Sequence, residues 1–273
     1  RFDLRYRYLC GARIPDDRTI CRFRRRLAPV LPGLFKQVLD MARAKGRLGM
    51  KVVALDGTKV EGSISQWRSV LDEAEREDAA DPDCRTMLSR RGRLNGYNVQ
   101  AAVDADSGLV IAADVTQSAT DFQELSNAVE RIEASAGRLP EALVADRGYE
   151  SAENADYLEK KGVEPYLHPK KQDADFWSFD GQGQIVCPKG SPLVPRDHFV
   201  RFGRRTTRLY VRQCPGCSHR PGCHSSKHKH LSFPSEVDPS ARIRNAHRCR
   251  SPEGRRILAR RGPAVETLFG QLK

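Results

Sequence analysis

The stretch VVALDGT, residues 52–58, joins four apolar residues to an aspartate and a glycine. The apolar run over 52–55 predicts a buried β-strand, and Asp56 at its end has two explanations. An Asp-Gly pair turns the chain easily, whereas a rigid strand end also holds a catalytic carboxylate steady. The stretch EALVADRGYES, residues 141–151, repeats the pattern with an apolar run followed by Asp146. This repetition favours the catalytic explanation.

The segments around these two strands predict an α/β fold. Residues 97–117 alternate apolar and polar residues on both sides of DADSG, which is typical of a β-hairpin. Helices are predicted over 121–137 and 152–162, and VEPYLHP predicts another strand. A right-handed crossover makes strands 52–55 and 142–145 parallel neighbours. Asp56 and Asp146 then emerge at the carboxyl edge, where open α/β sheets bind ligands.

Two carboxylates at one sheet edge repel one another and raise one pKa, and a divalent cation would remove this conflict. The C-terminal segment, residues 251–273, offers a third carboxylate. Ser251 is expected to cap one helix, and Pro263 is expected to interrupt it. A second helix then carries Glu266 and Lys273, which are two turns apart and share a face. The apolar residues expected to pack this helix on the sheet are Val265, Leu268, Phe269 and Leu272.

Residues 1–48 predict a small helical unit with a basic face. Asp16 or Asp17 is expected to cap a helix that contains Arg24 and Arg25. A second helix follows and is expected to end at Gly46. The arginines suit DNA contact in the manner of a helix-turn-helix, and they equally suit a dimerisation or packing element with a solvated face.

The composition points to a polyanionic partner. The 273 residues carry a net charge of +12 and a pI near 9.5, and clustered Lys and Arg neutralise phosphates. A solvated basic surface is the alternative explanation. No apolar stretch approaches the roughly 20 residues that span a bilayer, so a membrane is not an expected partner. The first residues include no Met and no secretory apolar region, which is typical of a fragment or an interior portion of a longer product.

Residues 170–250 form a segment rich in Cys, His and Arg. Cys187, Cys214, Cys217 and Cys223 include a C-x-x-C turn and suit a structural Zn²⁺ site with four thiolates. Reduced thiols without a ligand, or disulfides, are the alternatives. Arg204 and Arg205 lie among aromatic residues, a pattern that suits contact with the DNA backbone. A strand pair with a solvated arginine face explains it equally well.

The three acidic motifs VVALDGT, ALVADRGYES and AVETLFGQLK together resemble those of the DDE transposases of bacterial insertion sequences. The resemblance extends over DPDCRTM, GYNVQAAVD, GLVIAADVTQ and SPEGRRILARR, and so covers nearly the whole chain. It implies a ribonuclease-H-like mixed sheet with flanking helices, formed by residues 49–169 and 251–273, with the Cys-rich insertion 170–250 before the last catalytic helix.

The resemblance also implies residue roles. Asp56, Asp146 and Glu266 correspond to the catalytic acids, which hold two Mg²⁺ or Mn²⁺ ions. Relatives place a Tyr and an Arg upstream of the Glu, in a register where this chain has Ala259 and Gly262. The residues expected to contact DNA on this basis are Arg147, Tyr149, Arg260, Arg261 and Lys273.

The implied function is cleavage of DNA at the ends of an insertion sequence and joining of the freed strand to target DNA. The implied partners are transposon ends and target DNA, with a homodimer assembled on the DNA, in the bacterial cytoplasm at the nucleoid. A ribonuclease-H-like nuclease that cleaves without joining uses the same three acids. A non-catalytic DNA-binding remnant of a transposase is the alternative from another class.

Overall fold

The structure is a computed structural model that describes residues 11, 15–62, 81–89, 92–170, 177–218, 223 and 228–272. The chain divides into two compact units, Arg1–Leu48 and Gly49–Lys273, and each is described by itself. The short helix and loop expected over residues 65–96 lie outside the described residues up to residue 80. Within the rest of that stretch, residues 85–89 and 92–96 form β-strand instead, because they pair with one another in the sheet. Lys273 also lies outside the described residues. None of the described helices is long and apolar enough to cross a membrane.

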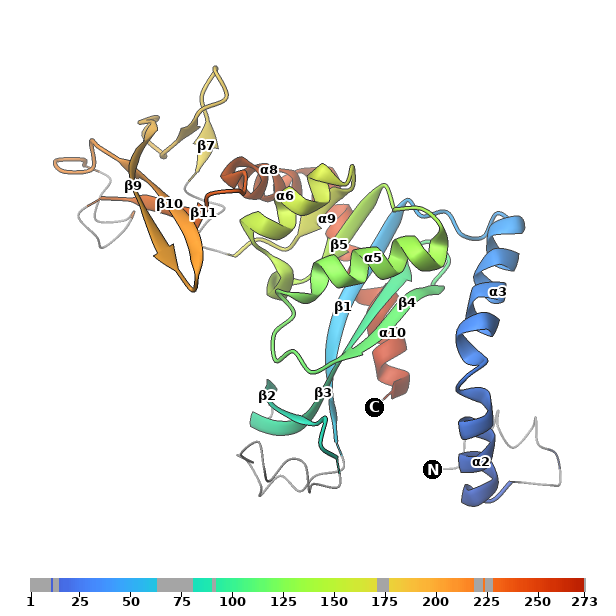
Figure 1. Cartoon of the computed structure of the whole chain (residues 1–273). Coiled ribbons are helices and arrows are strands. Elements are labelled where there is room, and N and C mark those ends of the chain that lie inside the picture. Colours follow the sequence, from blue (N-terminus) through green and yellow to red (C-terminus); the bar gives the residue numbers. More distant parts are fainter. Residues whose placement is uncertain are drawn as a thin grey trace. The chain divides into compact units, whose positions relative to one another are not determined.

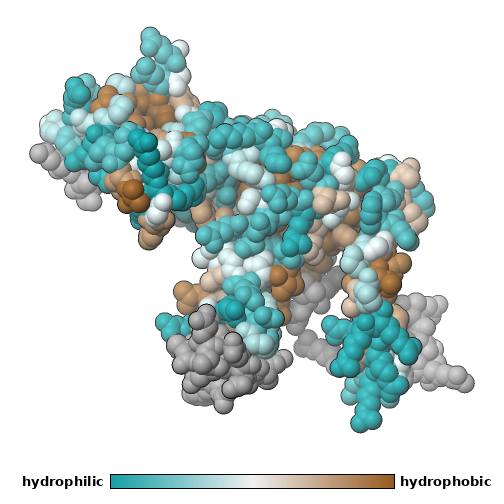
Figure 2. Space-filling model, in the orientation of Figure 1, coloured by the Kyte–Doolittle hydropathy of each residue, from teal (hydrophilic) through white to brown (hydrophobic). Residues whose placement is uncertain are grey.

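The described residues of the first unit form two helices, as predicted. Helix α2 spans Asp17–Leu27, and Asp16 caps it by accepting a hydrogen bond at Oδ1 from the Thr19 amide, 2.6 Å away. Helix α3 spans Leu31–Ala44 and is followed by Gly46 with a φ of 64°, the left-handed conformation that ends many helices. The apolar stripe on α3 is exposed, and a hydrophobic patch is visible over this helix in Figure 2. Its members are Leu34, Val38 and Met41.

The second unit is built on a mixed six-stranded sheet (Figure 1). Its strands run in the order β2-β3-β1-β5-β6, and β4 also pairs with β3. Strand β1 is parallel to β5 and β5 to β6, whereas β3 is antiparallel to β1, β2 and β4. The parallel neighbours and the hairpin are therefore confirmed. The bounds are β1 Val52–Glu61, β2 Arg85–Ser89, β3 Gly92–Asp104, β4 Val110–Thr116, β5 Ala142–Ala145 and β6 Glu164–Leu167.

Strand β1 does not end at Asp56, and in this respect the sequence-based expectation is wrong. Its parallel pairing with β5 stops at Leu55, but its antiparallel pairing with β3 continues as far as Glu61. The physical reason is that β3 is 13 residues long and supplies hydrogen-bonding partners well past the end of β5. Asp56 is therefore the first residue of β1 beyond its pairing with β5.

Helices cover both faces of this sheet. Helix α5, Glu124–Ala136, packs on one face through Leu125, Val129 and Ile132, which are fully buried. Helix α10, Arg261–Leu272, covers the other face, where Val265 and Phe269 join Val52, Ala54, Ala101 and other residues of the sheet in one core cluster. In Figure 1 α5 lies in front of the strands and α10 behind them. Alternate residues of β1 therefore face different helices.

The interruption of the C-terminal helix falls before Pro263. Helix α9 spans Pro252–Ala259, and α10 starts at Arg261. Pro263 lies in the first turn of α10, where a missing N–H and a fixed φ are tolerated. The prediction of two separate helices is confirmed, with the boundary at Arg260.

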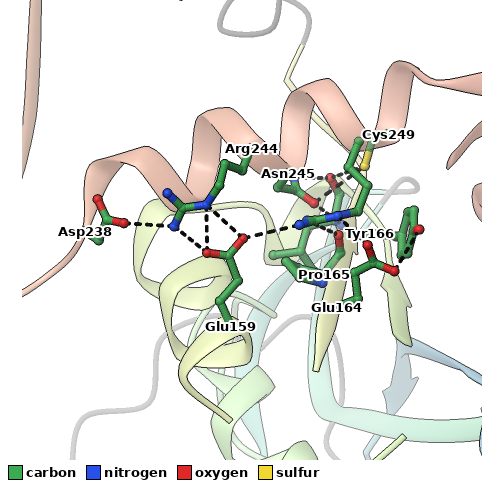
Figure 3. A network of polar contacts seen from close by, with 10 residues as sticks. Glu159, Glu164, Pro165, Tyr166, Asp238, Arg244, Asn245 and Cys249 are labelled. Atoms are coloured by element: carbon green, nitrogen blue, oxygen red, sulfur yellow. Dashed lines mark hydrogen bonds and ion pairs between the residues drawn. The ribbon is translucent and has the colours of Figure 1, made fainter. Parts of the chain in front are cut away.

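Helix α8, Pro239–Arg250, closes the β6 edge of the sheet. The fully buried Asn245 accepts a hydrogen bond from the Leu167 amide at 2.9 Å and donates one to its carbonyl oxygen at 2.8 Å. These bonds satisfy backbone groups of an edge strand, which otherwise invite pairing with another chain. Arg244 adds an ion pair to Glu159 of α6, Ala152–Lys160, with 2.5 Å between Nη2 and Oε2 (Figure 3). Although the predicted insertion extends to residue 250, this helix packs on the six-stranded sheet.

Before α8, the described strands of the insertion form two small sheets. Its three-stranded sheet contains β9 Leu193–Arg201, β10 Arg204–Val211 and β11 His230–Pro234, and a two-stranded sheet contains β7 Ser178–Phe179 and β8 Ile185–Val186. Trp177, Cys187 and Cys214 are buried in its core, which Ile243 of α8 completes. The insertion is thus joined to the six-stranded sheet through a shared helix.

Candidate active site

Asp56 lies at the point where β1 separates from β5, on the face of the sheet that α10 covers. Because alternate residues of a strand point to the same face, Asp56 shares a face with Val52 and Ala54, which pack against α10. Its Oδ2 is 2.7 Å from Nη1 of Arg261, the first residue of α10, and its Oδ1 accepts a hydrogen bond from the Gly57 amide at 2.9 Å. The Asp56 carboxylate is therefore held between β1 and the start of the C-terminal helix.

Asp146 is brought next to Asp56 by the sheet register. The last parallel pair is Leu55 with Ala145, so the following residue on each strand is an aspartate, on strands that lie roughly 4.8 Å apart. Asp146 caps the short helix η1, Arg147–Tyr149, by accepting a hydrogen bond from the Gly148 amide at 2.7 Å. Two carboxylates from sequence positions 90 apart (146 − 56) thus lie on neighbouring strands.

Burial raises the pKa of Asp56 to about 6. The Arg261 guanidinium acts in the opposite direction, while the charges of Asp146 and Asp121 raise the pKa further. A cation near these acids would favour the charged carboxylate. The electrostatics of the site therefore suit a bound positive charge.

Asp121 is a third aspartate at this site, and the sequence analysis did not identify it. It precedes α5 and accepts hydrogen bonds at Oδ1 from Asn98 Nδ2 at 2.8 Å and from Gln100 Nε2 at 2.9 Å. Asp121 lies three residues before Glu124 in the sequence. This spacing is typical of the start of a helix, so it does not by itself indicate a functional residue.

Glu266 lies on α10, whose neighbouring residues Val265 and Phe269 pack on the Asp56 face of the sheet, and its side chain is exposed. Among the described residues, no three His, Cys, Asp or Glu side chains are close enough together to hold a metal ion. The structure thus brings the strand-borne pair together and places the helix of Glu266 on the same face. It does not join the three carboxylates in one cluster.

The described residues expected to contact DNA fall into three groups. Arg147, Arg205, Arg24 and Arg25 are exposed. Tyr149 is fully buried, with its hydroxyl donating a hydrogen bond to Gln100 Oε1, so the expectation that it contacts DNA is wrong. The remaining arginines form ion pairs: Arg261 with Asp56, Arg260 with Asp106, and Arg204 with Glu153 and Glu236.

The cysteines of the insertion surround a lysine. Lys229 donates a hydrogen bond from its backbone amide to Cys214 Sγ at 3.2 Å and from Nζ to Cys223 Sγ at 3.5 Å. Burial lowers the pKa of Lys229, while Cys223, Cys187 and Cys214 act in the opposite direction. Cys217 follows on a turn in which its amide donates to the Cys214 carbonyl oxygen at 3.2 Å. All four thiols are free, and zinc binding stays a prediction.

A mixed sheet flanked by helices, with two acids on neighbouring parallel strands, is consistent with the ribonuclease-H-like class of nucleic-acid enzymes. Residues 47–244 match the family described as transposase DDE domain. This is 198 residues (244 − 47 + 1) of the 273. The chain therefore belongs to the DDE transposases of insertion sequences. The match includes Asp56 and Asp146 and ends before Glu266. No curated protein and no solved structure matches the chain significantly.

Proposed function

We propose that this protein is a metal-dependent DNA transposase in which Asp56, Asp146 and Glu266 hold the catalytic ions. The observation that carries the proposal is the sheet register, which makes Asp56 and Asp146 neighbours on parallel strands. Ala54 and Val144, two positions before these aspartates, pack in one core cluster with Val265 and Phe269 of α10, the helix that carries Glu266. The membership of the DDE transposase family supports the same roles.

The donor chemistry of the site fits Mg²⁺ or Mn²⁺, because these ions prefer carboxylate oxygens and keep positions open for substrate phosphate. The transposase family generally uses divalent metal ions. When bound, two such ions would stabilise the attacking and leaving oxygens of an in-line phosphoryl displacement. Asp56 and Asp146 would hold them from rigid strands, and Glu266 would approach from α10.

Other residues of the chain serve this reaction by orienting its parts. Arg261 holds the Asp56 carboxylate from the first turn of α10 and so fixes the helix of Glu266 against β1. Arg147 is exposed directly beside Asp146, where its guanidinium can neutralise a DNA phosphate. Arg24 and Arg25 of α2 and Arg205 of the β9–β10 hairpin are also exposed and offer further positive charge for DNA phosphates.

The reaction has two steps. Water attacks a phosphodiester at the element end, and the broken bond leaves a free 3′-hydroxyl. That hydroxyl attacks a phosphodiester of target DNA, forms a new bond to phosphorus and expels a 3′-oxygen of the target strand. No covalent bond to the protein is needed. We propose that a homodimer holds two element ends for this joining step.

The test uses labelled duplexes that carry the sequences flanking the gene, with a supercoiled plasmid as target and Mg²⁺ or Mn²⁺. Asp56→Ala and Asp146→Ala should abolish cleavage while DNA binding persists, because each removes a metal ligand and no phosphate contact. Asp114→Ala is the matched control, since Asp114 pairs with Arg131 on the opposite face of the sheet. Cleavage without joining would identify a nuclease, and binding without cleavage by the wild type would identify a non-catalytic protein.

A further inference from the structure

The carboxylate of Asp121 lies between the two segments that carry the predicted catalytic aspartates. We propose that Asp121 is a positioning residue that sets the spacing of Asp56 and Asp146 by filling the gap between Gly57 and Gly148. This inference rests on the proposed function, in which those two aspartates hold the metal ions.

Each oxygen of Asp121 faces one of the two glycines. A Cβ atom placed on Gly57 would lie 2.7 Å from Oδ1, and one placed on Gly148 would lie 3.2 Å from Oδ2. Gly57 directly follows Asp56, and Gly148 donates the hydrogen bond that orients Asp146. The Asp121 carboxylate therefore fills space beside both glycines, so that a side chain at either position would meet it.

Two hydrogen-bond donors and one cation hold the Asp121 carboxylate in place. Asn98 and Gln100 of β3 donate hydrogen bonds to Oδ1, and Lys59 of β1 lies with Nζ 3.6 Å from the same oxygen. The Lys59 ammonium is buried and makes no hydrogen bond among the described residues, so its charge is directed mainly at Asp121. A carboxylate that accepts two hydrogen bonds and has a cation beside it is fixed in orientation.

Gln100 extends this contact to the turn of Asp146. Its Nε2 donates to Asp121, so its Oε1 is left to accept the hydrogen bond from the Tyr149 hydroxyl. Tyr149 belongs to η1, the same turn that Asp146 caps. On its other side, Asp121 accepts a hydrogen bond at its backbone oxygen from the Glu124 amide, the first residue of α5. The spacing of the two acids is thereby tied to a buried helix.

The experiment compares Asp121→Ala and Asp121→Asn with Asp114→Ala. Asp114 is a matched control because its side chain is also 24% exposed and also forms an ion pair, with Arg131. Three quantities are measured: DNA affinity, the single-turnover cleavage rate of bound DNA, and Mn²⁺ binding by electron paramagnetic resonance. Amide hydrogen exchange of residues 146–150 is measured without DNA or metal.

We expect Asp121→Ala to slow cleavage by about 10- to 100-fold, because small misplacements of catalytic groups have effects of this order. Its DNA affinity should stay within about twofold of wild type, its Mn²⁺ binding should weaken, and exchange in residues 146–150 should accelerate. Asp121→Asn keeps one oxygen for the Asn98 and Gln100 donors, so its cleavage rate should stay within about fivefold of wild type.

Two outcomes would overturn the inference. If Asp121→Ala matches Asp114→Ala in cleavage rate and in amide hydrogen exchange of residues 146–150, Asp121 does not set the spacing of Asp56 and Asp146. If Asp121→Asn lowers the cleavage rate as much as Asp121→Ala does, the negative charge of the carboxylate is required. Asp121 would then act through its charge and not by setting the spacing of the two acids. Failure of the wild type to cleave or to bind Mn²⁺ would refute the proposed function instead, and the exchange measurement would still decide the role of Asp121.

Discussion

Replacement of Asp56 by asparagine should stabilise the metal-free protein at neutral pH. The folded protein raises the pKa of this carboxyl to about 6, first through burial and also through the charges of Asp146 and Asp121. Asparagine resembles the protonated acid and does not titrate. Its oxygen can still accept the hydrogen bond that the Gly57 amide donates to Asp56.

The sign and size of this effect follow from linkage between protonation and folding. Because the folded-state pKa is raised, the contribution of the group to stability is fully present below about pH 4 and is lost as the pH rises through about 6. The pKa of Asp56 in the folded protein exceeds its ordinary value by about 2.2 (6 − 3.8). At 1.36 kcal/mol for each pKa unit, this difference corresponds to about 3 kcal/mol of folding stability. This is an upper value, since the side chain is 17% exposed to water.

The assay is urea unfolding of wild type and Asp56→Asn near pH 4 and near pH 7, with and without Mg²⁺. The two proteins should be about equally stable at the lower pH, and the variant should be more stable by about 1–3 kcal/mol at the higher pH. Mg²⁺ should narrow that difference, because a bound cation stabilises the folded wild type. A difference that does not change with pH, or a variant that is less stable near pH 7, would refute the reasoning.

Three further predictions concern other parts of the second unit. Asn245→Leu removes both hydrogen bonds to Leu167, so the free energy of unfolding should fall by about 2–4 kcal/mol in urea titrations, and a change below about 1 kcal/mol would contradict the role of this asparagine. Arg205→Ala should reduce the slope of log DNA affinity against log salt concentration by about the amount expected for one phosphate contact. Arg204→Ala should change this slope less, because Arg204 already forms ion pairs with acidic side chains. Protein purified under reducing conditions should carry about one zinc ion per chain that Cys214→Ser removes; zinc-free wild type would leave these thiols as ordinary reduced cysteines.

Local patterns in the chain predicted the central strands and the helices α5, α6, α9 and α10, but not β2 or α8. Apolar runs marked the cores of β1 and β5, and helical spacing marked the buried face of α5 with Leu125, Val129 and Ile132. Glycine and proline also marked boundaries, as at Gly137, which has a φ of 67°. These features depend on neighbours within a few residues, so they can be predicted from local sequence patterns.

Features that depend on partners distant in the sequence were missed or misplaced. The end of β1 was predicted at Asp56, because the Asp-Gly pair resembles a turn, yet β3 extends the strand to Glu61. Tyr149 was expected at the DNA surface, since its motif follows a catalytic acid, yet the tertiary structure buries it against Gln100. Neither β3 pairing nor this contact leaves a local signature.

The sequence by itself identified Asp56 and Asp146 as the first carboxylates of the candidate site, because an apolar run followed by an aspartate occurs twice. Each apolar run forms a buried strand, and the aspartate therefore lies directly after buried strand residues. Only the tertiary structure decided how these acids are held. Asp121, Gln100 and Arg261 reach the site from the segment before α5, from β3 and from α10. Their roles arise from distances between elements that no spacing along the chain encodes. Strand formation is a local property of the polypeptide, whereas the spacing of two charges depends on the packing of the whole sheet.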